Sequence, residues 1–274
     1  MARVDTCRVI VLSGLVPGLV VCSCGCGADS SDPVDVRSSS AVASPSQPAS
    51  SDRLASPVAV GELLPSPKAR EQARAIQSLR AAGIVVETNG VEEAVLASFE
   101  DGAIGVSNGR KLAGLETLET IQLWNCPDAD DGLVELLSGL ASLRVLAIRG
   151  GRLTDACFDS LSLSPALESL NLGNSAGLTG DGVAGLLGRG RIKRLYLDRT
   201  ALSDSVVEGW PVTNSLEMLN VNHTRLGTKS ALRLREFAGL KSVFAVEAGI
   251  AAGEVATWRV ARPECLIYDG RERP

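Results

Sequence analysis

The chain has 274 residues, of which 45% are hydrophobic and 22% charged, values that are ordinary for a folded body of one or two domains. Its formal net charge of −5 gives no electrostatic reason to expect a nucleic-acid partner, because binding to phosphates requires a basic face. With a single histidine, His223, the sequence excludes any catalytic mechanism or metal site that needs two imidazoles.

The N-terminus has the layout of a secretory signal. Arg3 and Arg8 provide a basic start, and a short apolar stretch follows from Val9 to Val21. A membrane-spanning helix needs about 20 apolar residues, so this stretch is too short to span a hydrocarbon core. A basic start followed by a short apolar run predicts a secretory signal.

The sequence CSCGCG that comes next resembles the bacterial lipobox, in which an aliphatic residue stands three before, and a small residue just before, a cysteine that becomes lipidated. The run from Val21 to Cys24 fits best. The resemblance therefore implies a lipoprotein signal peptide at 1–23 and lipidation of Cys24, with Cys26 and Cys22 as alternatives. A metal or redox cluster is the other interpretation, and the lack of further ligands nearby disfavours it.

Residues 24–67 are interpreted as the lipidated cysteine and a disordered tether. Ser, Ala, Pro, Asp and Val dominate this segment, and it has no apolar periodicity. Such a composition cannot bury enough surface to offset the entropy of ordering the backbone.

The segment 68–90 predicts an N-terminal helical cap. Ala73, Ile76 and Leu79 fall on one helical face, and Gly83 ends the helix before the strand-like sequence IVVET.

A repeat then occupies residues 91–262. Its pattern is L-x-x-L-x-L, and the first positions of successive copies follow one another at a nearly constant spacing. The copies are Leu118-Ile121-Leu123, Leu143-Leu146-Ile148, Leu167-Leu170-Leu172, Ile192-Leu195-Leu197, Leu216-Leu219-Val221 and the weaker Leu240-Val243-Ala245. A degenerate first copy, Ala94-Ala97-Phe99, lies one period before Leu118.

A second pattern accompanies each copy. An apolar residue follows the strand, apolar or small residues stand five and eight further on, and the next strand begins at fourteen, as in Leu153, Phe158, Leu161 and Leu167. In the repeat that contains NCPDADDGL the register is ambiguous, with either Leu133 and Leu136 or Val134 and Leu137 at these two positions. The alternating and three-residue spacings predict a short strand and a short helix in every unit.

The repeat is similar to the leucine-rich repeat family, in particular to its ribonuclease-inhibitor-like or cysteine-containing branch. The segments RLTDACFDSL and GLTGDGVAGL resemble the xxTDxGLxxL motif of that branch. The resemblance implies an α/β solenoid of about seven repeats, a right-handed superhelix with a parallel concave sheet and short helices on the convex side. Cys126, Thr200 and Thr224 keep the polar residue that follows the strand in this family, whereas Gly151, Ser175 and Ala248 do not, so an incomplete internal polar ladder is expected.

Residues 263–274 are expected to form a C-terminal cap and tail. The sequence ECLIYDG supplies a last short strand, and RERP leaves the end polar.

The strand residues that alternate with the core leucines are the candidate binding surface. Aromatic side chains, amides and single charges at these positions are the composition expected of a protein-binding face. The candidates are Gln122, Trp124, Arg149, Asn171, Tyr196, Asp198, Asn220, Asn222 and Phe244. Arg149, Tyr196 and Asp198 are expected at the centre of this face, and Ala147, Gly173 and Val246 share it.

Recurring acidic residues follow the strands and raise the question of calcium. Helix capping and the helix dipole explain them more simply, because they precede the predicted helices. They are Asp130, Asp131, Asp155, Asp181 and Asp204. His223 is expected to be exposed or turn-capping, since no serine or cysteine nucleophile occupies a matching position.

The sequence as a whole predicts a non-enzymatic protein-interaction scaffold of the cell envelope, without a catalytic residue, metal or cofactor and held to the membrane only by its N-terminal lipid. It would be secreted if the lipobox is not used. The alternative is an envelope structural or carbohydrate-binding module in which Trp124, Tyr196 and Phe244 stack on sugar rings.

Overall fold

The computed structural model describes residues 66–271 of the chain, and the predicted signal peptide, lipidated cysteine and most of the tether lie outside this range. The described residues form eight helices and nine strands. The elements are α1 (Pro67–Ala81), β1 (Val85–Thr88), β2 (Ala94–Glu100), α2 (Val106–Ala113), β3 (Thr120–Trp124), α3 (Asp131–Ser138), β4 (Val145–Arg149), α4 (Cys157–Leu163), β5 (Ser169–Asn171), α5 (Val183–Gly188), β6 (Arg194–Tyr196), α6 (Asp204–Glu208), β7 (Met218–Asn220), α7 (Thr228–Leu234), β8 (Ser242–Phe244), α8 (Ala252–Ala261) and β9 (Leu266–Tyr268).

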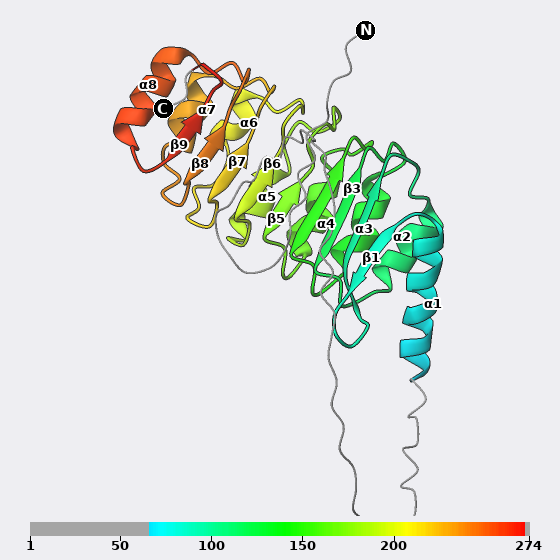
Figure 1. Cartoon of the computed structure of the whole chain (residues 1–274). Helices are drawn as coiled ribbons and strands as arrows, with labels where there is room; N and C mark the ends of the chain where they lie inside the picture. The colour runs from blue at the N-terminus through cyan, green and yellow to red at the C-terminus, as the bar shows by residue number, and fades with distance from the viewer. Residues whose placement is uncertain (1–65, 272–274) are drawn as a thin grey trace, which may run out of the picture. The chain divides into compact units, whose positions relative to one another are not determined.

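The nine strands form one sheet in the order of the sequence. The β1 strand pairs antiparallel with β2, and all later neighbours pair in parallel. The helices between the strands lie along one side of this sheet (Figure 1). A short helix between parallel neighbours is the connection that such a sheet requires.

The register of the sheet follows the sequence repeat. Ala97 of β2 pairs with Ile121 of β3, and Phe99 pairs with Leu123. The degenerate first copy is therefore a true repeat, as its spacing predicts.

The core follows the second sequence pattern. Leu153, Phe158, Leu161 and Leu167 are each about 1% exposed, and the equivalent residues of the other repeats are buried as well. The structure also resolves the ambiguous register: Val134 and Leu137 are fully buried, whereas Leu136 is exposed. Buried Ala129 stands at the first position of this unit, which places the helical pair five and eight positions later.

A residue with a left-handed backbone conformation follows almost every strand within three positions. Its φ lies between 52° and 77° in Asp101, Asn125, Gly150, Asn174, Arg199, His223 and Glu247. Bulky residues adopt this conformation at a cost, so the stacking of repeats has to hold Arg199, His223 and Glu247 in it. The same turn in each unit directs the chain from the sheet toward the helices.

The internal polar ladder is incomplete, as expected. Thr200 Oγ1 donates to Leu197 O at 2.7 Å, Thr224 Oγ1 donates to Val221 O at 2.6 Å, and Cys126 Sγ contacts Trp124 O at 3.5 Å. The Ser175 hydroxyl is buried without a partner.

The N-terminal helix differs from the prediction in one residue. Ile76 and Leu79 are buried, but Ala73 is exposed and Ala75 packs against the core instead. A helix turns by about 100° per residue, which places Ala73 at the rim of a face centred on Ile76 and Leu79.

The last predicted strand is present as β9, which pairs in parallel with β8. Strands in register continue from β2 to β9, and each of β2 to β8 is followed by a helix on the same side of the sheet. The fold is a leucine-rich repeat solenoid.

Candidate binding surface

One face of the sheet is not covered by the helices, and we call it the open face (Figure 1). One side chain from each of the strands β3 to β9 lies on it in register with those of its neighbours. From β3 to β9 this row is Gln122, Ala147, Asn171, Tyr196, Asn220, Phe244 and Tyr268. Adjacent strands lie about 4.8 Å apart, so the row displays its side chains at that spacing. The structure thus places the predicted residues of this row together, although Ala147 is buried.

Arg149 and Asp198, expected at the centre of the face, bind each other. Arg149 Nη1 donates to Asp198 Oδ1 at 3.0 Å, and Nη2 donates to Oδ2 at 2.7 Å. The pair crosses over the chain that follows β5, and Gly173 makes room for it: a Cβ at Gly173 would lie 2.4 Å from Asp198 Oδ1. The Asp198 side chain is 8% exposed and that of Arg149 is 24% exposed. The Asp198 carboxylate is therefore largely covered, because the Arg149 guanidinium binds both of its oxygens.

Trp124 extends this arrangement toward β3. The guanidinium carbon of Arg149 lies 5.7 Å from the centre of the Trp124 ring, within the range of a cation–π contact. Arg149 is thus held by a carboxylate and an aromatic ring together. At the centre of the open face the charge of Arg149 is therefore neutralised by Asp198.

Asparagine side chains on the open face are held by the backbone. Asn171 Oδ1 accepts from Gly173 N at 3.1 Å, Asn220 Oδ1 accepts from Asn222 N at 3.1 Å, and Asn222 Oδ1 accepts from Val246 N at 2.7 Å. The backbone N–H that each oxygen accepts orients the amide, and its NH₂ group is the donor that the side chain can offer. These amides are fixed hydrogen-bond donors on either side of Tyr196.

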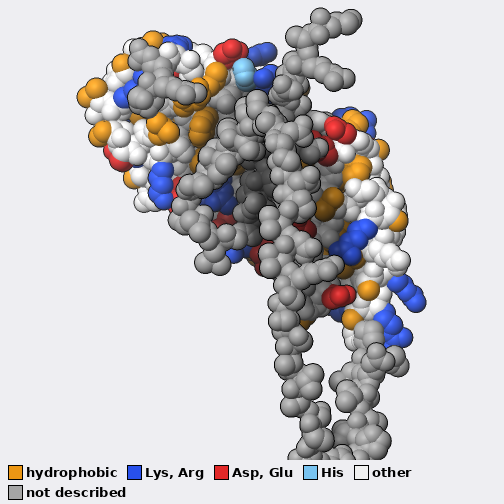
Figure 2. All heavy atoms as spheres, in the orientation of Figure 1, with side chains coloured by type: hydrophobic (Ala, Val, Ile, Leu, Met, Phe, Trp, Pro, Cys, Tyr) orange, Lys and Arg blue, Asp and Glu red, His pale blue; other side chains and the backbone are white. Residues whose placement is uncertain are grey.

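The C-terminal part of the open face is apolar. We call the side chains of Tyr196, Met218, Phe244, Leu266 and Tyr268 the aromatic cluster. Tyr196 Oη contacts Met218 Sδ at 3.1 Å, and burial raises the pKa of Tyr196. The rings of Phe244 and Tyr268 meet edge to face with their centres 6.3 Å apart. Hydrophobic side chains also appear at the end of the molecule that carries β7–β9 in Figure 2.

Three members of this cluster, Met218, Leu266 and Tyr268, were not among the predicted site residues. Tyr268 stands one repeat after Phe244 and pairs with it in register, so the repeat period is the signal that identifies it. Met218 stands two residues before Asn220, and it shares the face of Asn220 because side chains alternate along a strand.

A row of alternating charges lies just before the strands. Glu168 Oε1 accepts from Arg144 Nη2 at 3.0 Å, and Glu168 Oε2 accepts from Lys193 Nζ at 2.9 Å. Hydrogen bonds from Lys193 and Arg144 outweigh burial and lower the pKa of Glu168. We call this row the charge ladder: Glu119, Arg144, Glu168, Lys193, Glu217 and Lys241.

His223 is half-exposed and engaged through both ring nitrogens. Arg199 Nη2 lies 3.2 Å from Nε2, and Glu247 Oε2 lies 2.9 Å from Nδ1. The three residues occupy the same left-handed position in successive repeats. In Figure 2 the histidine side chain, in pale blue, lies at the surface near acidic and basic side chains. His223 is therefore a half-exposed turn residue bound by its two neighbours in the row.

The recurring aspartates mostly bind the following repeat, not their own helix. Asp130 caps its own helix, since Oδ1 accepts from Leu133 N at 3.1 Å. Asp131 instead accepts from Thr154 N at 2.9 Å, and Asp155 accepts from Gly180 N at 2.8 Å. These two residues therefore bind N–H groups of the next unit and do not cap their own helices, although Asp131 stands in the first turn of α3, where the helix dipole favours a carboxylate. Within 66–271, no group of three or more His, Cys, Asp or Glu residues could hold a metal ion.

The three thiols of the described range, Cys126, Cys157 and Cys265, are buried and unpaired. Burial, reinforced by neighbouring aspartates, raises the pKa of Cys126 to about 11 and that of Cys157 to about 12. Burial also raises the pKa of Cys265. A thiol with a raised pKa is a poor nucleophile because it is rarely ionised.

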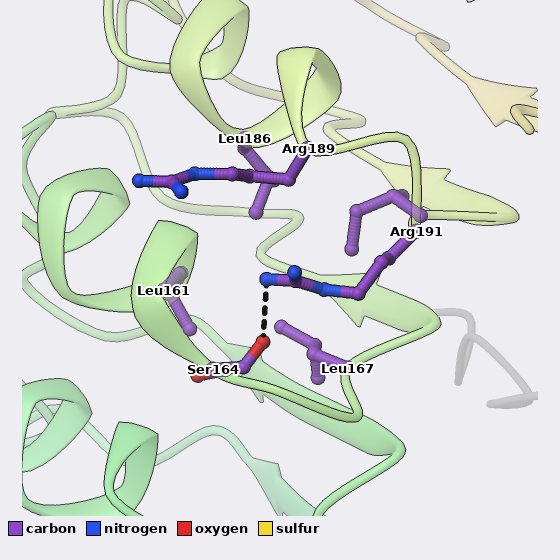
Figure 3. Close-up of a pocket in the computed structure, with 7 residues that line it drawn as sticks. Leu161, Ser164, Leu167, Leu186, Arg189 and Arg191 are labelled. Atoms are coloured by element: carbon purple, nitrogen blue, oxygen red, sulfur yellow. Dashed lines mark hydrogen bonds between the residues drawn. The ribbon is translucent and has the colours of Figure 1, made fainter.

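Hollows in the described surface are shallow. One, between α4 and α5, is too small to hold a water molecule, and there Arg191 Nη2 donates to Ser164 O at 2.9 Å (Figure 3). Leu161, Leu167 and Leu186 surround it, so its walls are mainly core side chains. A second hollow is lined by ladder residues, including Arg144, Glu168 and Lys193. Neither encloses a candidate catalytic group.

No family model matches the sequence, and none of the curated proteins matches it. Among solved structures, the chain is similar to an internalin from Listeria monocytogenes, with 14% sequence identity and a TM-score of 0.36. The similarity covers 60% of this chain and 57% of that chain, so the chain spans little more than half of the internalin's length. The fold follows from the register of the strands and from the helix after each of β2 to β8, independently of this similarity. No helix between residues 66 and 271 combines the length and hydropathy that crossing a membrane requires.

Proposed function

We propose that this protein is a non-enzymatic protein-interaction scaffold that binds its partner on the open face of the solenoid. The observation that carries the proposal is the aromatic cluster of Tyr196, Met218, Phe244, Leu266 and Tyr268, which shares one face with oriented asparagine donors. Aromatic residues that stand beside fixed polar groups are the typical anchors of protein interfaces.

The centre of the face supports this proposal. The Arg149–Asp198 pair is satisfied before any partner arrives, and Trp124 braces it. A partner therefore meets a surface without an unpaired buried charge, and docking incurs little additional desolvation cost there. A surface of this kind gives no preference for nucleic acid.

We further propose that the chain is displayed on the cell envelope through a lipid on Cys24, and that its repeats are of the ribonuclease-inhibitor-like type. The lipobox-like sequence and the apolar stretch before it support the anchor. Labelling cells with a radioactive fatty acid tests it. Cys24→Ala should abolish the label, and label retained in that variant moves the site to Cys26 or Cys22.

The binding proposal is tested by placing a photo-crosslinking amino acid at Asn220, between Tyr196 and Phe244. The same amino acid at Leu163, an exposed residue at the end of α4, is the matched control. We expect a protein adduct from Asn220 and none from Leu163 when the full chain is expressed in its native host. Equal adducts from both positions would contradict docking on the open face.

Once the adduct is identified, the aromatic cluster can be tested directly. Phe244→Ala and Tyr196→Ala should each weaken binding of the identified partner at least tenfold, because central aromatic anchors contribute about 2 kcal/mol or more. Leu163→Ser should leave the affinity unchanged.

The alternative ligand is an envelope polysaccharide, for which Trp124, Tyr196 and Phe244 would be stacking platforms. To test this ligand, the wild type and the variants Phe244→Ala, Tyr196→Ala and Leu163→Ser are compared for retention on purified cell-wall polysaccharide. Retention that is lost with Phe244→Ala, without a protein adduct from Asn220, favours the carbohydrate ligand.

A further inference from the structure

An open hollow of about 290 Å³ lies at the edge of the solenoid where helices lead into the next strands. Its lining comes from the loops that precede β4, β5, β6 and β7, and we call it the basic hollow. The charged members of the lining are Arg144, Glu168, Arg191 and Lys193. No residue of the open-face row lines it, so it is separate from the surface proposed for the protein partner.

The lining carries more positive than negative charge. Three cations and one carboxylate give it a net charge of +2, although the whole chain carries −5. Glu168 divides its two oxygens between Arg144 Nη2 at 3.0 Å and Lys193 Nζ at 2.9 Å. The carboxylate thus holds two cations at the hollow but can neutralise only one of them.

Arg191 supplies the charge that Glu168 leaves over. Its Nη2 donates to the carbonyl oxygens of Ser162 and Ser164, at 3.2 and 2.9 Å, and Figure 3 shows the side chain extending from the loop after α5 toward Ser164. Carbonyl groups fix the guanidinium in place without cancelling its charge. Its Nε and Nη1 have no partner among the described residues, so they are donors that a ligand can use.

Two more arginines strengthen the positive field around the basic hollow. Arg189 and Arg194 are exposed, and neither forms an ion pair with a carboxylate of residues 66–271. Glu217, the ladder carboxylate of the next unit, is bound by Lys241 at 2.9 Å. A concave surface concentrates the field of the charges around it, so the hollow attracts anions.

The net charge of the lining indicates which anion fits. A carboxylate ligand carries one negative charge and would leave the hollow positive, as would a phosphodiester. A phosphate monoester carries about 1.5 to 2 negative charges at pH 7 and balances the lining. Its oxygens match the planar fork of an arginine, and Ser215 adds a hydroxyl to the lining.

We propose that the basic hollow binds a phosphate monoester, which Arg144, Arg191 and Lys193 hold by charge-assisted hydrogen bonds. Glu168 has two effects on this site. It holds Arg144 and Lys193 in place before the ligand arrives, and its own charge weakens the attraction for the ligand. The hollow lies at the lower end of the range of about 300–1,000 Å³ for small-molecule sites, so it accommodates a phosphate with a small attached group.

Isothermal titration calorimetry of the full chain with glycerol phosphate tests the proposal, in nonionic detergent that keeps the proposed lipid dispersed. We expect a dissociation constant below about 1 mM for the wild type and much weaker binding of acetate. Arg191→Ala and Lys193→Ala should each weaken binding of glycerol phosphate at least tenfold. Lys229→Ala is the matched control, since it also removes a lysine that pairs with a glutamate, Glu208, but far from the hollow, and it should leave the affinity unchanged.

Glu168→Gln separates ligand binding from a purely structural role of these cations. The substitution removes the one negative charge of the lining, and glycerol phosphate should bind at least threefold more tightly as a result. If the cations serve only to pair with Glu168, the variant gains no affinity. If Arg191→Ala does not fold, Lys193→Ala and Glu168→Gln still decide the question.

Vesicles distinguish a soluble ligand from a lipid headgroup. The chain is mixed with phosphatidylcholine vesicles with and without phosphatidic acid, whose headgroup is a phosphate monoester. The proposed lipid anchor binds both vesicles equally, so an increase with phosphatidic acid that Lys193→Ala abolishes assigns the hollow to a headgroup. Binding of glycerol phosphate without such an increase assigns it to a soluble ester.

The proposal is overturned if the wild type binds neither glycerol phosphate nor phosphatidic acid above the phosphatidylcholine level. It is also overturned if variants that keep the wild-type circular dichroism spectrum, Lys193→Ala and Lys229→Ala, lose the same affinity.

Discussion

At the scale of single residues, the open face depends on the absence of a side chain at Gly173. Arg149 ends β4 and Asp198 follows β6, 49 positions later, so their contact passes over the chain that follows β5. A Cβ added at Gly173 would crowd both partners, since it would also lie 2.9 Å from Arg149 Nη1. The glycine therefore determines that the two charges meet.

Gly173→Val should separate this pair and lower the free energy of unfolding by about 1–3 kcal/mol, because it leaves a mostly buried carboxylate without its partner. The φ of Gly173 is not in the left-handed region, so the substitution tests the pair and not the backbone conformation. Gly188→Ala is the control, since nothing lies within 4 Å of a Cβ added there. Urea denaturation measures both, and equal stability of the two variants would contradict the role given to Gly173.

At the scale of elements, aspartates connect one helix to the start of the next. Asp204, the first residue of α6, accepts from Gly227 N at 2.9 Å and from Ser230 N at 2.7 Å, at the start of α7. Burial opposes its ionisation, but hydrogen bonds from Ser230, Gly227 and Lys229 outweigh that effect and lower the pKa of Asp204 below its usual 3.8.

The lowered pKa makes stability depend on pH in one direction. A carboxyl whose pKa is lower in the folded state stabilises the fold above its unfolded pKa, and this contribution is lost as the pH falls through the folded pKa. Asp204→Asn should therefore reduce the free energy of unfolding at pH 7 by about 1–3 kcal/mol and flatten its decrease below about pH 4. Asp159→Asn, on the exposed side of α4, is the control. Thermal unfolding between pH 3 and pH 7 checks the prediction, and parallel curves for Asp204→Asn and the wild type would refute it.

The sequence predicts the elements well and the contacts between them poorly, for a physical reason. Burial imposes the repeat period on the apolar positions, so strands, helices and the core can be read from spacing, and burial also decides the register at Val134 and Leu137. Polar contacts follow no such constraint. Asp155 can cap its own helix or bind the next repeat, and spacing alone does not distinguish the two; in the structure it accepts from Gly180 N. The Arg149–Asp198 pair is a contact of the same kind.

At the scale of the whole molecule, the charge ladder runs through six successive repeats. Its signs alternate from Glu119 to Lys241, and each inner member therefore meets opposite charges on both sides. The contacts of Glu168 with Arg144 and Lys193, and of Glu217 with Lys241, are partly exposed, so each pair contributes little by itself. The alternation matters more than any one pair, because skipping one repeat in the stack would place like charges side by side.

Glu168→Lys tests this alternation at the position with two cationic neighbours. The substitution replaces two attractions with two repulsions and should lower the free energy of unfolding by about 1–2 kcal/mol at low salt. High salt should shrink the difference from the wild type, since screening weakens interactions between exposed charges. Glu236→Lys is the control: it reverses a carboxylate whose partner, Arg233, lies within its own repeat. If Glu168→Lys and Glu236→Lys lose the same stability at low salt, the ladder has no role beyond single ion pairs.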